Sequence, residues 1–134
     1  MPMPKHIVLI IDDDNLILTT LKKRFSTQNV ESFTARTPEE AKQLLAKITP
    51  ELVILDLLLT KEDGSSGVLD YMKSEERLNQ VPVLVLTNLD KQELRNMMLA
   101  EKNVKEYLIK GSMTLDDLYN KTLGYLEPNS STKG

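Results

Sequence analysis

Polar side chains that could transfer a phosphoryl group stand at the ends of four apolar runs in this sequence. They are Asp12 and Asp13 after the first run, Asp56 after the second, Thr87 closing the third and Lys110 after the fourth. If the runs are strands of one parallel sheet, their carboxyl ends share one edge, and these side chains converge in one crevice. Carboxylates, a hydroxyl and an amine gathered there are the groups that phosphoryl transfer to an aspartate requires.

The adjacent acids Asp12 and Asp13 follow Ile7–Ile11, which has the composition of a buried strand. Like charges held so close together are costly unless a cation compensates them. A hard divalent ion with oxygen ligands relieves the repulsion, and Mg²⁺ suits a site that must also hold a phosphate. The alternative is a solvated acidic turn that caps the next helix. Both interpretations remain open from these two residues alone.

Asp56 closes the apolar run Leu52–Leu55 and is the candidate nucleophile. Its carboxylate would attack a phosphoryl group and form an acyl phosphate, a covalent chemistry open to aspartate. An aspartate after a single apolar run is more often a turn or capping residue. Because Asp12 and Asp13 also follow an apolar run, the interpretation of Asp56 as a nucleophile is favoured here.

Thr87 and Lys110 supply the candidate hydrogen-bond donors for a phosphoryl group. The Lys110 ammonium would pair with phosphate oxygens as a point charge and would also compensate the carboxylates. Taken alone, Thr87 is better explained as a strand-favouring residue, and Lys110 as an exposed lysine at a strand end. Tyr107 stands three residues before Lys110 and therefore on the opposite face of its strand. It is either a two-position element, which packs inward or points to water, or simply an aromatic residue favoured in strands.

Strand-like and helix-like segments alternate along the chain, which predicts a parallel sheet with helices on both faces. The predicted strands are His6–Ile11, Val30–Thr34, Leu52–Leu55, Val83–Leu86 and Val104–Ile109. Five helices are predicted. The first begins near Asp14 and Asn15, and the second begins near Pro38. The other three cover Ser66–Glu76, Lys91–Glu101 and the residues after Thr114. The segment Gly64–Gly67 is predicted to be a turn and helix cap rather than a phosphate loop.

Short polar pairs predict where two of the helices begin. Asp90 with Glu93, and Thr114 with Asp117, have the spacing of a capping box. Asn103 stands where a left-handed residue would end a helix. The last predicted helix presents an apolar stripe, formed by Leu115, Tyr119, Leu123 and Leu126.

Composition excludes several classes of function. The 134 residues suit one domain, and a formal net charge of −3 without a run of Lys or Arg argues against a nucleic-acid partner. The absence of cysteine excludes disulfides and thiolate chemistry. No apolar stretch reaches membrane-spanning length, and the first apolar run is too short for a signal peptide. We therefore expect a cytoplasmic protein without a membrane partner, whose residues 127–134 form a disordered tail or a linker stub.

In their order, these motifs resemble the receiver domain of response regulators, the CheY-like family of two-component signalling. The resemblance covers residues 5–126 and is carried by Leu9–Asp14, Leu52–Leu57, Asp63–Gly64, Pro82–Thr87 and Glu106–Lys110. It implies an α/β fold of the flavodoxin-like kind, a doubly wound five-stranded parallel sheet with strand order 2-1-3-4-5 and helices on both faces. The chain departs from the family's usual residues at three positions: Thr60, Asn88 and Gly111.

The resemblance also implies a mechanism. Asp56 would accept a phosphoryl group from the phosphohistidine of a sensor histidine kinase or phosphotransfer protein. Asp13, Asp56 and the backbone carbonyl of Leu58 would ligate Mg²⁺, with Asp12 supporting the metal through water. Thr87 and Lys110 would contact the phosphoryl group, and Tyr107 would turn inward as Thr87 shifts. The fourth helix, fifth strand and fifth helix would then present a changed surface to a downstream protein.

Alternatives to a stand-alone switch remain. The chain could be a receiver excised from a larger multidomain regulator or hybrid kinase, or an interaction module that never carries phosphate. A flavin-binding electron carrier of similar fold is disfavoured, because aromatic residues make up only 4% of the chain. As a switch, the domain would catalyse its own phosphorylation and dephosphorylation and little else.

Overall fold

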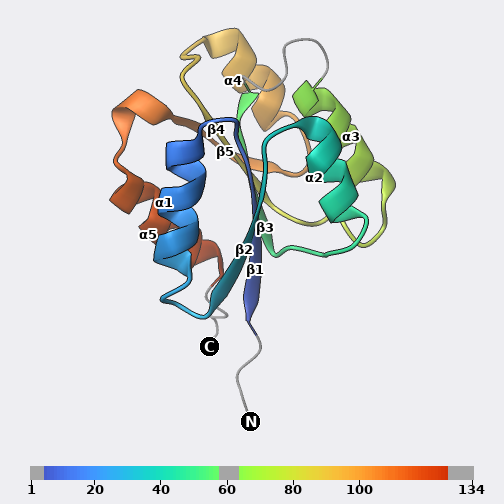
Figure 1. The fold of residues 1–134 in the computed structure, drawn as a ribbon. Helices are drawn as coiled ribbons and strands as arrows, with labels where there is room; N and C mark the ends of the chain where they lie inside the picture. The colour runs from blue at the N-terminus through green and yellow to red at the C-terminus, as the bar shows by residue number, and fades with distance from the viewer. Residues whose placement is uncertain (1–4, 58–63, 127–134) are drawn as a thin grey trace, which may run out of the picture.

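The computed structural model describes residues 5–57 and 64–126 of the chain. Five parallel strands form one sheet in the order β2-β1-β3-β4-β5, with helices on both faces (Figure 1). The strands are β1 (His6–Ile11), β2 (Val30–Ala35), β3 (Leu52–Leu55), β4 (Val83–Thr87) and β5 (Val104–Ile109). The helices are α1 (Asn15–Phe25), α2 (Pro38–Leu45), α3 (Gly64–Ser74), α4 (Gln92–Leu99) and α5 (Leu115–Leu126). The doubly wound fold and its strand order are therefore as predicted.

The core has two layers, one on each face of the sheet. Along β1, Leu9 and Ile11 belong to the layer covered by α2, α3 and α4, whereas Val8 and Ile10 belong to the layer covered by α1 and α5. This division follows from the strand itself, because successive side chains point to opposite faces. All four residues of β3 are buried, as expected of a central strand that is covered on both sides. The packed sheet thereby fixes the positions of the residues that directly follow its strands.

The predicted starts of α1, α2 and α5 are confirmed. The Asp14 carboxylate accepts a hydrogen bond from the backbone N–H of Leu16 and caps α1. Thr114 and Asp117 form a reciprocal capping box at α5: the Thr114 hydroxyl accepts the Asp117 N–H at 3.0 Å, and the Asp117 carboxylate accepts the Thr114 N–H at 3.1 Å. These bonds satisfy backbone donors that a helix start leaves without partners.

The predicted capping box of Asp90 and Glu93 is wrong. Helix α4 begins at Gln92 after Lys91, which makes no side-chain capping bond. Asp90 therefore lies one residue too early to act as the cap. The helix also ends at Leu99, two residues before the predicted Glu101.

Asn103 was predicted to be left-handed, and this is also wrong. Among the described residues other than glycine, only Asn29 has a positive φ, of 58°. Asn103 is instead buried, and its side-chain amide donates to the carbonyls of Leu78 at 3.3 Å and Val81 at 2.8 Å. The asparagine thus joins the connection before β4 to the connection before β5, a tertiary role that needs no unusual backbone.

Two further differences concern helices. The segment Gly64–Gly67 belongs to the first turns of α3, so the predicted turn is wrong and the helix begins earlier than Ser66. In α5 the buried face includes Leu118 and Thr122 as well as the predicted Tyr119 and Leu126. The Thr122 hydroxyl is buried without cost because it donates to the Leu118 carbonyl at 2.9 Å. No helix in the described part of the chain is long and apolar enough to cross a bilayer.

Candidate functional site

An acidic cluster lies at the carboxyl edge of the sheet. Asp12 follows β1 and Asp56 follows β3, its direct neighbour in the sheet, so the two carboxylates emerge side by side. Asp13 comes from the same connection as Asp12. One carboxylate oxygen from each of the three residues lies within 4.8 Å of the others. The fold thus brings these three acids together, as the sequence predicted.

The three acids differ in burial and in the groups that hold them. Asp12 and Asp56 are each only 1% exposed, whereas Asp13 is exposed. The Asp12 carboxylate accepts the Asp14 N–H at 2.9 Å. Burial raises the pKa of Asp12 to about 6, and the negative charge of Asp56 adds to this, although the Asp14 amide and Lys110 act in the opposite direction. The cluster therefore carries charge that its surroundings only partly compensate.

Lys110 is the cation of the site. Its Nζ lies 3.0 Å from Asp12 Oδ2 and 3.2 Å from Asp56 Oδ2. Burial alone would lower the pKa of Lys110, but the hydrogen bond to Asp12 and the negative charges of both acids outweigh it and raise the pKa. The ammonium is therefore charged at neutral pH. It stands at the start of a 3₁₀ turn, Lys110–Ser112, directly after β5.

Thr87 ends β4, the strand that lies between β3 and β5. The residue is fully buried, and its hydroxyl oxygen accepts the backbone N–H of Leu89 at 3.1 Å. Thr87 is thus placed between the strand that leads to Asp56 and the strand that leads to Lys110. Its hydroxyl is engaged with the β4–α4 connection.

Tyr107 lies on the other face of β5 from Lys110 and is buried in the core beneath α4. Its hydroxyl donates to the carbonyl of Leu89 at 2.5 Å. Arg95 of α4 covers the ring, with the guanidinium carbon 5.0 Å from the ring centre, and donates from Nη1 to the Tyr107 carbonyl at 3.5 Å. Of the two positions considered from the sequence, the ring occupies the inward one. One residue, Leu89, therefore connects Thr87 through its N–H and Tyr107 through its carbonyl.

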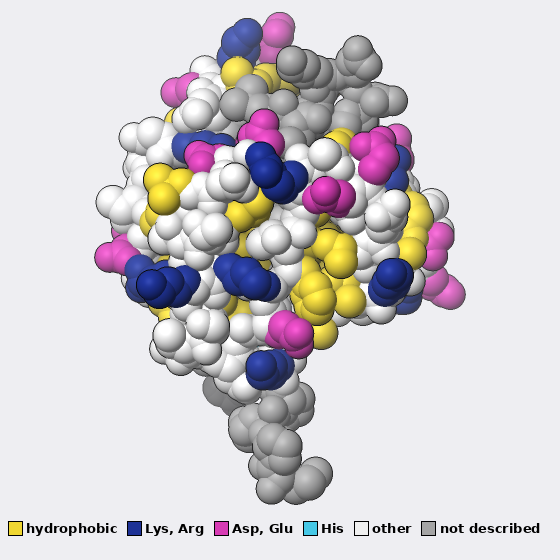
Figure 2. Space-filling model, in the orientation of Figure 1, with side chains coloured by type: hydrophobic (Ala, Val, Ile, Leu, Met, Phe, Trp, Pro, Cys, Tyr) yellow, Lys and Arg dark blue, Asp and Glu magenta, His cyan; other side chains and the backbone are white. Residues whose placement is uncertain are grey.

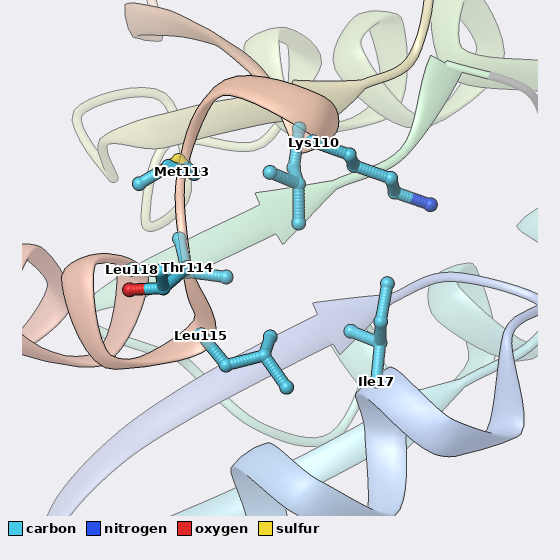
Figure 3. A pocket seen from close by; sticks show the side chains of 7 residues that line it. Ile17, Lys110, Met113, Thr114, Leu115 and Leu118 are labelled. Atoms are coloured by element: carbon cyan, nitrogen blue, oxygen red, sulfur yellow. The ribbon is translucent and has the colours of Figure 1, made fainter.

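A small apolar pocket of about 180 Å³ opens beside Lys110. Its apolar lining includes Ile17 of α1, Leu115 and Leu118 of α5, and Met113 from the connection before α5. Figure 3 shows the Lys110 amine at one end of this pocket, pointing away from Met113 and Leu115. Lys110 therefore lines this pocket and also contacts two acids of the cluster.

The structure brings together four of the predicted site residues: Asp12, Asp13, Asp56 and Lys110. It links two more, Thr87 and Tyr107, through the backbone of Leu89. The predicted backbone ligand Leu58 lies outside the described residues, as does Thr60. Sequence reasoning missed the contacts of Leu89 and Arg95, and it missed the hydrogen bond from Arg36 Nη2 to the backbone carbonyl of Asp13. Apart from the stacking of Arg95 on the Tyr107 ring, these contacts involve backbone groups, and such a partner leaves no residue-type signal in a sequence.

The acidic cluster fits a divalent metal ion. Carboxylate oxygens are the ligands that hard cations prefer, and the three acids present theirs within 4.8 Å of one another. Two of the carboxylates are buried, which makes an added positive charge more favourable there than at the surface. Asp12, Asp13 and Asp56 could therefore bind such an ion together.

Comparison with known proteins agrees with this geometry. The family profile of the response regulator receiver domain matches residues 8–122. A probable transcriptional regulator, ycf27 of Porphyridium aerugineum, is 33% identical over 108 residues, which are 81% of this chain and 43% of that protein. The alkaline phosphatase synthesis transcriptional regulatory protein PhoP of Bacillus subtilis is 28% identical over 103 residues, 77% of this chain and 41% of that protein. The chain thus spans less than half the length of these relatives.

Solved structures show the same fold. A two-component response regulator from Clostridium difficile superposes with a TM-score of 0.79 at 23% identity, covering 95% of this chain and all of that one. The Mn²⁺-bound form of the response regulator Rcp1 has a TM-score of 0.72 at 26% identity and covers 96% and 99% of the two chains. Together with the family match over most of its length, these observations place the chain in the response regulator receiver domain family of two-component signalling.

Proposed function

We propose that this domain is a phosphoacceptor switch, in which Asp56 takes a phosphoryl group from the phosphohistidine of a sensor histidine kinase or phosphotransfer protein, with Mg²⁺ bound. The observation that carries the proposal is the contact of Lys110 with both Asp12 and Asp56 inside the acidic cluster. A buried carboxylate beside an ammonium and two further acids has what acceptance of a phosphoryl group needs. As such a switch, the domain would act in the cytoplasm together with its kinase.

The transfer step is a displacement at phosphorus. A carboxylate oxygen of Asp56 forms a bond to phosphorus while the phosphorus–nitrogen bond of the donor breaks, and the donor imidazole keeps that electron pair and takes up a proton. Lys110 and Thr87 supply N–H and O–H donors for the phosphoryl oxygens. Asp13, Asp56 and the Leu58 carbonyl would hold Mg²⁺, with Asp12 in support. The ion would neutralise charge on the acids and on the phosphoryl oxygens.

The signal would leave the site through the β4–α4 connection. When the Thr87 hydroxyl turns to a phosphoryl oxygen, the Leu89 N–H loses its present acceptor. Leu89 remains tied through its carbonyl to Tyr107, over which Arg95 of α4 is stacked. A change of charge at Asp56 thereby reaches the surface formed by α4, β5 and α5, where a downstream protein would bind.

Acceptance of phosphate by Asp56 is testable by mass spectrometry of the intact protein, incubated with Mg²⁺ and a small phosphodonor such as phosphoramidate. The expected result is a mass increase of one phosphoryl group, absent from Asp56→Asn and after chelation of the metal. Asp14→Asn serves as the matched control, because Asp14 caps α1 and should leave labelling unchanged. No labelling of the wild-type chain would support a phosphate-independent interaction module, and labelling of Asp56→Asn would refute the assignment of the acceptor.

A second candidate is that the chain is the receiver part of a larger regulator or hybrid kinase. It is favoured by the length of the curated relatives, of which the chain covers 43% and 41% in the two cases above. An immunoblot of the native source with an antibody against this domain distinguishes a stand-alone protein from a larger multidomain one. A band near 15.2 kDa indicates a stand-alone switch, and a much larger band indicates the multidomain protein.

A further inference from the structure

Asp13 is held differently from the other two acids of the cluster, and the following inference rests on the proposed function. Asp12 accepts the Asp14 N–H and contacts Lys110, and Asp56 also contacts Lys110. The Asp13 carboxylate is exposed, and within residues 5–57 and 64–126 no hydrogen bond or ion pair holds it. Its direction therefore depends on the backbone of the β1–α1 connection.

That backbone is contacted from the neighbouring strand. Arg36 directly follows β2 and donates from Nη2 to the backbone carbonyl of Asp13 at 3.3 Å. The two connections run beside each other because β1 and β2 are paired to their ends, with Ile11 opposite Ala35, and because the Asp12 N–H donates to the Ala35 carbonyl at 3.0 Å (Figure 1). A side chain at position 36 is thus within reach of the acidic cluster from outside.

Arg36 is itself anchored to the start of α2. Its backbone N–H donates to Glu40 Oε1 at 2.8 Å, and the Glu40 N–H donates to the hydroxyl of the capping residue Thr37 at 3.1 Å. These bonds fix the backbone from which the guanidinium extends. The contact on Asp13 therefore comes from a held position rather than from a free surface arginine.

We propose that Arg36 is a positioning residue for the metal site, which holds the β1–α1 connection so that Asp13 faces the ion. The guanidinium also brings a positive charge near a cation site, and this charge alone would weaken metal binding. At physiological ionic strength the field of an exposed charge is largely screened, whereas the hydrogen bond acts locally. The two effects of removing Arg36 have opposite signs, so metal affinity distinguishes them.

The test compares Mn²⁺ binding, followed by electron paramagnetic resonance, in the wild-type protein, Arg36→Gln and Arg36→Lys. If Arg36 positions Asp13, the dissociation constant rises about tenfold in Arg36→Gln, the lower end of the range for groups that orient metal ligands. Arg36→Lys keeps the charge and one donor, and it should recover part of the loss. In the metal-free protein, the amides of Asp13 and Asp14 should exchange hydrogen faster in Arg36→Gln.

Two controls make the result decisive. Lys23→Gln removes the same charge from an exposed site at the end of α1 and should leave Mn²⁺ affinity unchanged. In an Asp13→Asn background, Arg36→Gln should weaken binding no further, because the residue it positions is gone. Equal or tighter Mn²⁺ binding by Arg36→Gln overturns the inference while the wild-type protein still binds metal. Failure of the wild-type protein to bind Mn²⁺ overturns the proposed metal site itself.

Discussion

Two buried carboxylates share one ammonium in this site, since Lys110 contacts both Asp12 and Asp56. Burial raises the pKa of Asp12, and the negative charge of Asp56, which the single ammonium compensates only in part, adds to this effect. The uncompensated charge favours a divalent ion and disfavours the folded state without one. Function and stability are therefore opposed at single residues of this cluster.

The raised pKa of Asp12 predicts a dependence of stability on pH. Its pKa in the folded protein is about 6, against an ordinary value of 3.8. Between these values the folded state binds a proton that the unfolded state has released, so this residue's contribution to stability falls as pH rises through the window. Above this pH window, and in the absence of metal, the free energy of unfolding of Asp12→Asn should be higher than that of the wild-type protein by about 1–3 kcal/mol.

Urea denaturation at about pH 4.5, 6 and 7.5, with a chelator present, measures the difference in free energy of unfolding between Asp12→Asn and the wild-type protein. The advantage of Asp12→Asn should be small at the lowest pH, grow towards neutrality and then level off. Asp14→Asn, at the exposed cap of α1, provides the comparison. A difference that is constant over the whole range would show that Asp12 is ionised throughout.

At the scale of elements, the β4–α4 connection is held from both sides by one residue. The N–H of Leu89 is bound by Thr87 of β4, and its carbonyl is bound by Tyr107 of β5. Arg95 of α4 lies over the Tyr107 ring and contacts its backbone. Two strands and one helix therefore meet at a short chain of hydrogen bonds, which is the kind of discrete arrangement that a switch can exchange for another.

Arg95→Ala should loosen this arrangement. Removing the guanidinium from the Tyr107 ring costs about 0.5–1 kcal/mol of stability, as for other partly exposed cation–π contacts. It should also increase access of a soluble paramagnetic reagent to Tyr107, measured by ¹⁹F NMR of fluorotyrosine-labelled protein. Arg24→Ala is the matched control, because Arg24 stacks on Tyr119 in the same way, 4.1 Å from the ring centre, between α1 and α5. Equal access to Tyr107 in both variants would mean that Arg95 does not hold the ring.

At the scale of the whole molecule, the acidic cluster sits where the two core layers meet at one edge of the sheet. Asp12 and Asp56 follow the two adjacent central strands, whose side chains pack into both layers. On the face shown in Figure 2, lysine and arginine side chains are interspersed with acidic ones. The core packs tightly on both faces of the sheet, whereas the site residues lie at its edge. A change of charge at Asp56 could therefore shift the β4–α4 connection without disturbing the core.

A stable phosphoryl mimic, beryllofluoride with Mg²⁺, should reveal the path of that change by NMR. The amide of Leu89 is expected to shift strongly, because Thr87 would leave it for the mimic. Smaller shifts should follow in Tyr107 and along α4 (Gln92–Leu99). Asp56→Asn should abolish them all. Shifts confined to the acidic cluster in the wild-type protein would mean that binding at Asp56 does not reach α4.

Much of the fold could be predicted from local sequence. Apolar runs that end in Asp56 or Thr87 define strands together with their direction, and parallel strands bring such ends to one edge whatever the details of packing. The capping box of Thr114 and Asp117 was predictable because both partners are side chains at a fixed spacing. The similar spacing of Asp90 and Glu93 misled, because the backbone enters α4 one residue later.

The sequence by itself determined the chemical groups of this site and the edge at which they meet, because both follow from strand ends and residue types. Only the tertiary structure decided that Lys110 contacts both buried acids, that Tyr107 points inward to Leu89, and that Arg36 reaches Asp13. The last two contacts end on backbone carbonyls, which every residue possesses and which no residue type marks. Their partners are selected by strand order and side-chain length in three dimensions, and local patterns along the chain do not encode that selection.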